Sequence, residues 1–80
     1  MLLRMQLRLL AFAQAAERLG FRERLIEYSP EESPRALLAR TAPTLDLQTI
    51  RVALDCEYCD LDAPIGPAGE LALIPPVSGG

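Results

Sequence analysis

The chain has 80 residues and a mass of 8.8 kDa, which allows one domain that buries only about 60% of its unfolded surface. Half of the residues are hydrophobic and 24% are charged, a balance typical of a folded globular domain and not of a disordered chain. Eleven acidic and eight basic side chains give a net charge of -3, which excludes the basic surface that a nucleic-acid-binding protein needs.

The basic side chains are all arginine, and the sequence contains no histidine and no lysine. These absences remove the usual general base and any amine that could form a Schiff base. We therefore expect no self-contained enzyme chemistry, no bound cofactor and no metal site.

The N-terminal third is predicted to form a strand, a short helix and a second strand. Hydrophobic residues alternate with polar ones in the first strand, residues 5–12. Its inward side chains are Met5, Leu7 and Leu9. Helix-forming residues at 14–19 precede Gly20, which takes the left-handed conformation that ends a helix most easily. Residues 21–28 are predicted to be an edge strand, protected by its charges and paired with the first.

The main helix is predicted at residues 33–40. Ser33 is a good N-cap, Pro34 suits the first helical position, and Arg40 lies where a cation favours the helix dipole. Pro43 then ends the helix.

The C-terminal half is predicted to contain three more strands, at residues 49–54, 58–61 and 70–74. The inward residues of the first of these are Ile50, Val52 and Leu54. Two prolines after residue 74 prevent further ladder hydrogen bonds.

This order of elements predicts an α+β fold of the β-grasp type, a mixed sheet of four to five strands with one main helix packed on one face. The first and last strands would lie parallel and adjacent at the centre of the sheet. We expect a β-grasp domain at residues 1–74 and an extended C-terminal Gly-Gly tail at residues 75–80.

The sheet face away from the main helix is predicted to expose an apolar patch that binds a partner, because such patches on small domains usually mark an interaction surface. Its residues are Leu10, Ala53, Ala72 and Ile74. An alternative interpretation is a second small core beneath the loop that carries Leu45 and Leu47.

Cys56 and Cys59 form a C-x-x-C pair without a second metal half-site or a thioredoxin-like context. They are predicted to be reduced thiols at a strand end or turn, with a redox dithiol or a shared zinc half-site as alternatives. We expect a cytoplasmic location, because no disulfide framework is present and Arg8 interrupts the only apolar run that resembles a signal peptide. No segment approaches the ~20 apolar residues of a membrane span.

The end of the chain is its most informative segment. Pro75 and Pro76 hold the first part extended, and Gly79 and Gly80 have no side chains and can enter a narrow channel. Six residues reach at most about 20 Å at ~3.3 Å per residue. The reactive group at the tip is the carboxylate of Gly80. We expect another enzyme to activate it as an acyl adenylate before a sulfur nucleophile attacks. On spacing alone, a frayed terminus is the alternative.

Residues 71–80, LALIPPVSGG, resemble the closing motif of the molybdopterin synthase small subunit, in which an apolar strand precedes Pro-Pro-Val, one small residue and Gly-Gly. Residues 12–20 resemble the strand-to-helix segment of that family, with Gly20 in register. The predicted helix at 33–40 and strand at 51–54 follow in the expected order, so the resemblance covers nearly the whole chain.

The resemblance implies a ubiquitin-like sulfur carrier of the MoaD/ThiS type, itself non-catalytic. An ATP-dependent enzyme would adenylate Gly80, and the product would become a thiocarboxylate. The tail would insert into the large subunit of the synthase, in an assembly of two small and two large subunits, and donate sulfur to the cyclic pterin precursor. The inserted residues would be Pro75, Pro76, Val77, Ser78 and Gly79.

Two departures from the family pattern leave the partner open. Ile74 occupies a position that is commonly aromatic, and the acidic turn before the last strand is reduced to residues 67–70. One alternative is a sulfur carrier for thiamin thiazole synthesis. Another is a protein modifier conjugated through Gly80, although a chain without lysine cannot form polymers on its own side chains.

Overall fold

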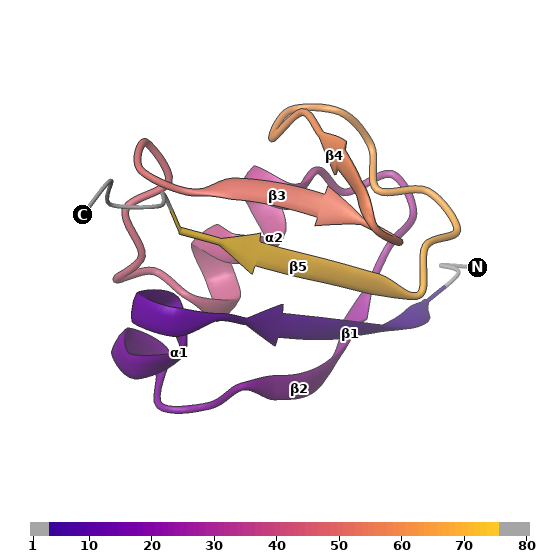
Figure 1. Ribbon diagram of the computed structural model, residues 1–80. Helices are drawn as coiled ribbons and strands as arrows, with labels where there is room; N and C mark the ends of the chain where they lie inside the picture. Colours follow the sequence, from indigo (N-terminus) through magenta and orange to yellow (C-terminus); the bar gives the residue numbers. More distant parts are fainter. Residues whose placement is uncertain (1–3, 76–80) are drawn as a thin grey trace.

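The computed structural model describes residues 4–75 and places seven elements along them (Figure 1). In chain order they are β1 (Met5–Ala11), α1 (Ala13–Leu19), β2 (Glu23–Tyr28), α2 (Pro34–Thr41), β3 (Arg51–Leu54), β4 (Glu57–Cys59) and β5 (Glu70–Ile74). In the described residues, neither helix is long and apolar enough to cross a bilayer.

The strands form one mixed sheet in the order β2-β1-β5-β3-β4. β1 and β5 run parallel in its middle, with Leu9 opposite Leu71, and the other neighbouring pairs are antiparallel. α2 lies behind the sheet in Figure 1, whereas α1 lies at the end of the sheet where β5 finishes. The β-grasp prediction is therefore confirmed, with five strands and with the first and last strands central.

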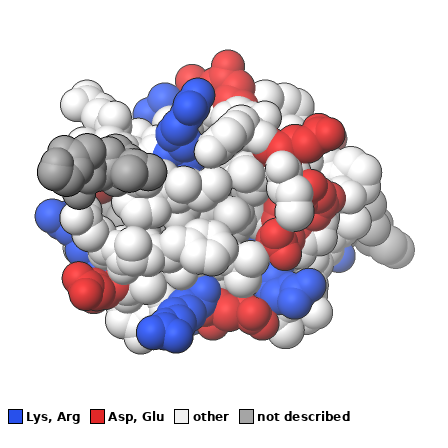
Figure 2. All heavy atoms as spheres, viewed as in Figure 1, with Lys and Arg blue, Asp and Glu red and all other residues white. Residues whose placement is uncertain are grey.

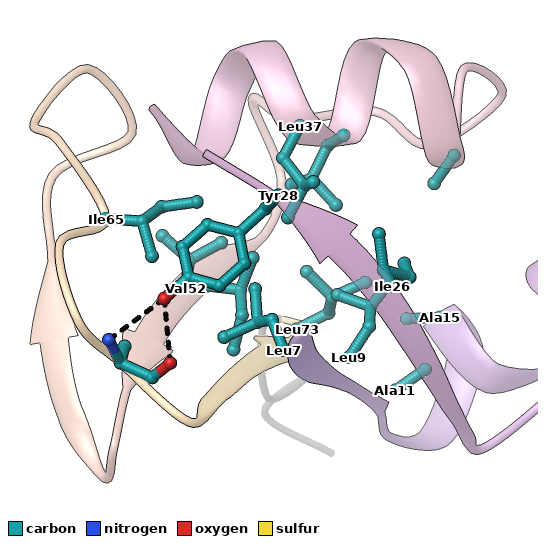
Figure 3. Close-up of a cluster of buried hydrophobic side chains, with 14 of the residues drawn as sticks. Leu7, Leu9, Ala11, Ala15, Ile26, Tyr28, Leu37, Val52, Ile65 and Leu73 are labelled. Atoms are coloured by element: carbon teal, nitrogen blue, oxygen red, sulfur yellow. Dashed lines mark hydrogen bonds between the residues drawn. The ribbon is translucent and has the colours of Figure 1, made fainter. Parts of the chain in front are cut away.

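The core lies between α2 and the inner face of the sheet, and Figure 3 shows its central side chains. Alternation places every second residue of the central strands inward, as predicted for β1 and β3. Fully buried members include Leu7, Leu9, Leu37, Leu38, Leu71 and Leu73. The loop residues Leu45 and Leu47 pack against this same cluster and not over a second core.

Both helices have the termini predicted for them. The Oγ of Ser33 accepts a hydrogen bond from the N–H of Ala36 at 3.1 Å, and Pro34 opens α2. Gly20 follows α1 with a φ of 79°, a left-handed conformation that glycine adopts without a steric penalty.

The predicted boundaries were wrong at β4, which spans Glu57–Cys59 and not residues 58–61. Asp55 and Cys56 form a two-residue turn in which both φ angles are positive, so pairing resumes at once with Leu54 opposite Glu57. β3 also begins later than predicted, because Thr49 belongs to a turn in which its N–H donates to the carbonyl of Asp46.

Candidate functional site

β5 delivers the chain to the predicted tail. Its neighbours β1 and β3 bond it on both sides, and it ends at Ile74, directly before Pro75. Of the predicted tail, Pro75 is described, whereas Pro76, Val77, Ser78, Gly79 and Gly80 lie outside the described residues. The boundary at residue 75 and the roles of these six residues stay predictions. The base of the tail is nevertheless attached to the central strand of the sheet.

A hollow of about 270 Å³ lies beside Pro75, and we call it the exit hollow. α1 forms one wall and the loop before β3 forms the other. The side chains that line it, besides Pro75, are Gln14, Ala15, Arg18, Leu45, Thr49 and Ile50, with Asp46 at the rim. Sequence reasoning missed this hollow, because its two walls are about thirty residues apart in the chain.

The outer face of the sheet, which points away from α2, carries the four residues predicted to form a partner surface. Leu10 lies opposite Ala72, and Ala72 lies opposite Ala53, so these three form one row across β1, β5 and β3. Ile74 lies on the same face, opposite Arg51. The structure thus brings the four residues together, and their role in binding stays a prediction.

The apolar area of this face differs in detail from the prediction. Ala53 and Ala72 are only 5% and 7% exposed, because larger neighbours flank them, while Leu10 and Ile74 are half-buried. Tyr58 continues the row opposite Ala53 and is 63% exposed, and the guanidinium of Arg51 lies 4.7 Å from the centre of its ring. Figure 2 shows a band of uncharged atoms across this face, with charged side chains around it. Sequence reasoning did not include Tyr58 in this surface, because its neighbours follow only from the register of the β3–β4 hairpin.

The two cysteines lie in the β3–β4 turn, which contains Cys56, and at the end of β4, which contains Cys59. Cys56 is exposed and has a φ of 73°, while Cys59 is half-buried in β4, and neither forms a disulfide. Burial raises the pKa of the Cys59 thiol, which favours its protonated form. Among the described residues, no cluster of three or more side chains could hold a metal ion. A raised pKa is the opposite of what a reactive dithiol needs.

Tyr28 fixes the segment that leads into β5. Its ring is buried in the core (Figure 3). Its hydroxyl lies 2.7 Å from the carbonyl oxygen of Gly66 and 2.9 Å from that of Ala68. The same hydroxyl accepts the N–H of Ala68 at 3.1 Å. Burial raises the pKa of Tyr28, so the hydroxyl keeps the proton that it donates. The prediction of an edge strand at Tyr28 gave no sign of this contact forty residues away.

The structure is similar to several solved structures of comparable length. SAMP1 from Haloferax volcanii is 25% identical with a TM-score of 0.72, over 95% of this chain and 100% of that one. A Pyrococcus furiosus protein assigned as molybdopterin converting factor, subunit 1, is 17% identical with a TM-score of 0.73, over 91% and 99%. The HVO 2177 protein of Haloferax volcanii is 19% identical with a TM-score of 0.66, over 96% and 88%.

The mixed sheet with parallel central strands, and the Gly-Gly segment that follows its last strand, define a ubiquitin-like sulfur carrier of the MoaD/ThiS type. The ThiS family model matches residues 9–80. The chain belongs to the ThiS family.

Proposed function

We propose that this protein is the sulfur-carrying small subunit of a molybdopterin synthase, and that Gly80 carries the sulfur as a thiocarboxylate. The observation that supports this most strongly is the family match, which extends through the terminal Gly-Gly to residue 80. The Pro-Pro-Val segment before it resembles the small subunit of molybdopterin synthase in particular.

The chemistry requires two steps at the carboxyl of Gly80. An activating enzyme joins this carboxylate to the α-phosphate of ATP, which releases pyrophosphate and gives an acyl adenylate. Hydrosulfide then attacks the acyl carbon, AMP leaves, and a thiocarboxylate and a proton remain. This chain contributes the main-chain carboxylate of Gly80, and its sequence has no histidine to act as a general base and no lysine to act as an amine nucleophile.

The fold contributes position to this chemistry. β5 is bonded on both sides, so the base of the tail has a fixed direction relative to the outer face. A partner that binds the outer face therefore receives the tail at a defined place. We propose that the large subunit binds this face and receives residues 75–80 in its active site. The assembly would contain two small and two large subunits. In the transfer, the thiocarboxylate sulfur bonds to a carbon of the pterin precursor and displaces an oxygen substituent from it. Water then attacks the acyl carbon of Gly80, the C–S bond breaks, and the carboxylate of Gly80 and a thiolate on the pterin remain.

Mass spectrometry of the intact chain tests the proposal. After incubation with the activating enzyme of the same organism, ATP and sulfide, the mass should rise by the difference between one sulfur and one oxygen. A variant with one residue added after Gly80 should keep its fold, as measured by circular dichroism, and should not gain sulfur. When the large subunit and the pterin precursor are added, the sulfur-carrying wild-type chain should return to its original mass. An unmodified wild-type chain under these conditions would contradict the proposal.

A protein modifier is the second candidate, and the similarity to SAMP1 of Haloferax volcanii favours it, since that relative is also known as small archaeal modifier protein 1. Conjugation would join Gly80 to amines of other proteins, because this chain has no lysine. Covalent products that disappear when Gly80 is deleted would support this function. Sulfur transfer to a thiazole synthase, in place of the large subunit, would instead assign the carrier to thiamin synthesis.

A further inference from the structure

We propose that the exit hollow is a docking site for the enzyme that activates Gly80, and that this enzyme inserts an aliphatic side chain there with a carboxylate beside Arg18. The inference rests on the proposed function, since it assumes that the reacting carboxyl belongs to Gly80. It concerns a surface distinct from the outer face of the sheet.

The length of the tail carries the argument. Five residues follow Pro75, and they reach at most about 17 Å at ~3.3 Å per residue. An adenylating site must exclude water to protect the acyl adenylate, so Gly80 has to pass through a protein wall. A wall one helix thick is about 10 Å. About 7 Å of reach then remains between the surface of the enzyme and Pro75.

Such a short remaining distance brings the enzyme onto the residues around Pro75. α1 and the loop before β3 flank this proline at the exit hollow. A surface within about 7 Å of Pro75 lies within side-chain reach of both walls. The enzyme therefore covers the exit hollow whenever Gly80 is fully inserted.

The chemistry of the hollow indicates what fills it. Its deep side chains are apolar, with Ala15 and Ile50 buried and Leu45 half-buried, so an aliphatic side chain matches them. Arg18 is exposed at the edge on α1 and offers a cation to the partner. The Asp46 carboxylate on the opposite edge already accepts the N–H of Gln48 at 3.0 Å. This neutral donor leaves the charge of Asp46 in place, so the two edges carry opposite charges, and an acidic group of the partner complements the Arg18 edge.

Pyrophosphate exchange into ATP tests the docking, because this reaction reports adenylation of Gly80 alone. The full chain and the purified activating enzyme of the same organism are used, with labelled pyrophosphate as the probe. Gln14→Trp should fill the hollow, and Arg18→Glu should replace the cation at the α1 edge with an anion. Each should lower kcat/KM for the carrier about tenfold, mainly through KM, which corresponds to about 1.4 kcal/mol.

Two matched variants serve as controls. Ala36→Trp introduces the same tryptophan on the exposed first turn of α2, and Arg24→Glu makes the same charge change on the edge strand β2. Both should exchange at the wild-type rate. Circular dichroism and the urea midpoint establish that each variant is folded. If Gln14→Trp does not fold, the exchange rate of Arg18→Glu alone tests the docking.

The outcomes separate this inference from the proposed function. If both Arg18→Glu and Gln14→Trp exchange pyrophosphate at the wild-type rate, the docking is overturned and the carrier function stays intact. Faster exchange by Gln14→Trp would mean that the tail itself fills the hollow, and a dimer lost in that variant would assign the hollow to a second copy. Either result overturns the inference. A wild-type chain that supports no exchange would overturn both proposals.

Discussion

At the scale of one atom, the hydroxyl of Tyr28 joins β2 to the segment before β5, and we predict that Tyr28→Phe is strongly destabilising. The substitution keeps the buried ring but removes the hydroxyl proton that the carbonyls of Gly66 and Ala68 share. The Gly66 carbonyl still accepts the N–H of Ala68 at 2.9 Å, so the buried carbonyl of Ala68 is the group left without a donor. Unsatisfied buried polar groups cost about 1–3 kcal/mol. The free energy of unfolding in urea should fall by this amount.

Tyr58→Phe is the matched control, because Tyr58 is exposed on the outer face and its loss of a hydroxyl should change stability little. A second measurement uses pH. The pKa of Tyr28 is raised from its ordinary value of 10.0 in the folded state, so its contribution is complete below pH 10 and is lost as the pH rises through the folded-state pKa. Wild type should therefore lose stability relative to Tyr28→Phe at high pH. Equal stability of the two at neutral pH would contradict the assigned hydrogen bonds.

Cys56 occupies the second position of the β3–β4 turn, where its φ of 73° favours glycine. An L residue in this left-handed conformation carries about 1 kcal/mol of strain. We predict that Cys56→Gly raises the free energy of unfolding by about 0.5–1 kcal/mol, measured in urea under reducing conditions.

Cys56→Ala removes the thiol but keeps an L residue in the left-handed conformation, so its free energy of unfolding should match that of wild type. If the alanine variant instead loses sulfur transfer, Cys56 has a chemical role that the turn does not explain. A double Cys56→Ser and Cys59→Ser variant with full transfer would exclude the redox and zinc alternatives.

At the scale of elements, an ion pair ties α2 to the turn that precedes it. Arg40 donates to both oxygens of Glu32 at 2.7 and 2.8 Å, and also to the carbonyl of Glu27 at the end of β2. The hydrogen bond from Arg40 lowers the pKa of Glu32 below its ordinary value of 4.5. A depressed folded-state pKa stabilises the fold above pH 4.5, and this stabilisation is lost as the pH falls through the folded-state pKa.

We predict that Glu32→Gln lowers stability by about 1 kcal/mol at pH 7, since Arg40 is half-exposed and solvent screens the pair. The difference from wild type should shrink as the pH falls below 4.5. Urea unfolding at a series of pH values measures it, and Glu31→Gln, on the exposed neighbour, is the control. A difference that is the same at pH 3 and pH 7 would show that the charge of Glu32 does not stabilise the helix.

Elements were predictable from the sequence wherever the local signal decided the structure. Ser33 and Pro34 predicted the start of α2, Gly20 predicted the end of α1, and alternation predicted β1. An apolar run between a turn-forming segment and two prolines predicted β5. The start of β4 was not predictable, because a two-residue turn without glycine is a weak signal. Contacts between distant segments, such as that of Tyr28, depend on topology and leave no mark on the local sequence.

At the scale of the whole molecule, the tail motif and the alternation of β1, β3 and β5 together predicted where the candidate site lies. The motif predicts that Gly80 is the reactive end, and alternation placed Leu10, Ala72 and Ile74 on one face. The extent of the apolar area was not predictable, since Tyr58 joins it only through the register of β4. The exit hollow was hidden for a similar reason, because α1 and the loop before β3 meet only in the fold.

The outer face leads to a last prediction about the complex. Ile74→Glu should weaken binding of the large subunit by tenfold or more, because a carboxylate in the centre of an apolar contact must lose its water. Its cross-strand neighbour Arg51 can pair with the new carboxylate, so the free energy of unfolding should change by less than about 1 kcal/mol. Calorimetric titration of the large subunit measures the affinity. Ala36→Glu, at an exposed residue of α2 on the other side of the sheet, should bind like wild type. Unchanged affinity of Ile74→Glu would mean that the partner binds elsewhere and that β5 positions the tail without its outer face taking part.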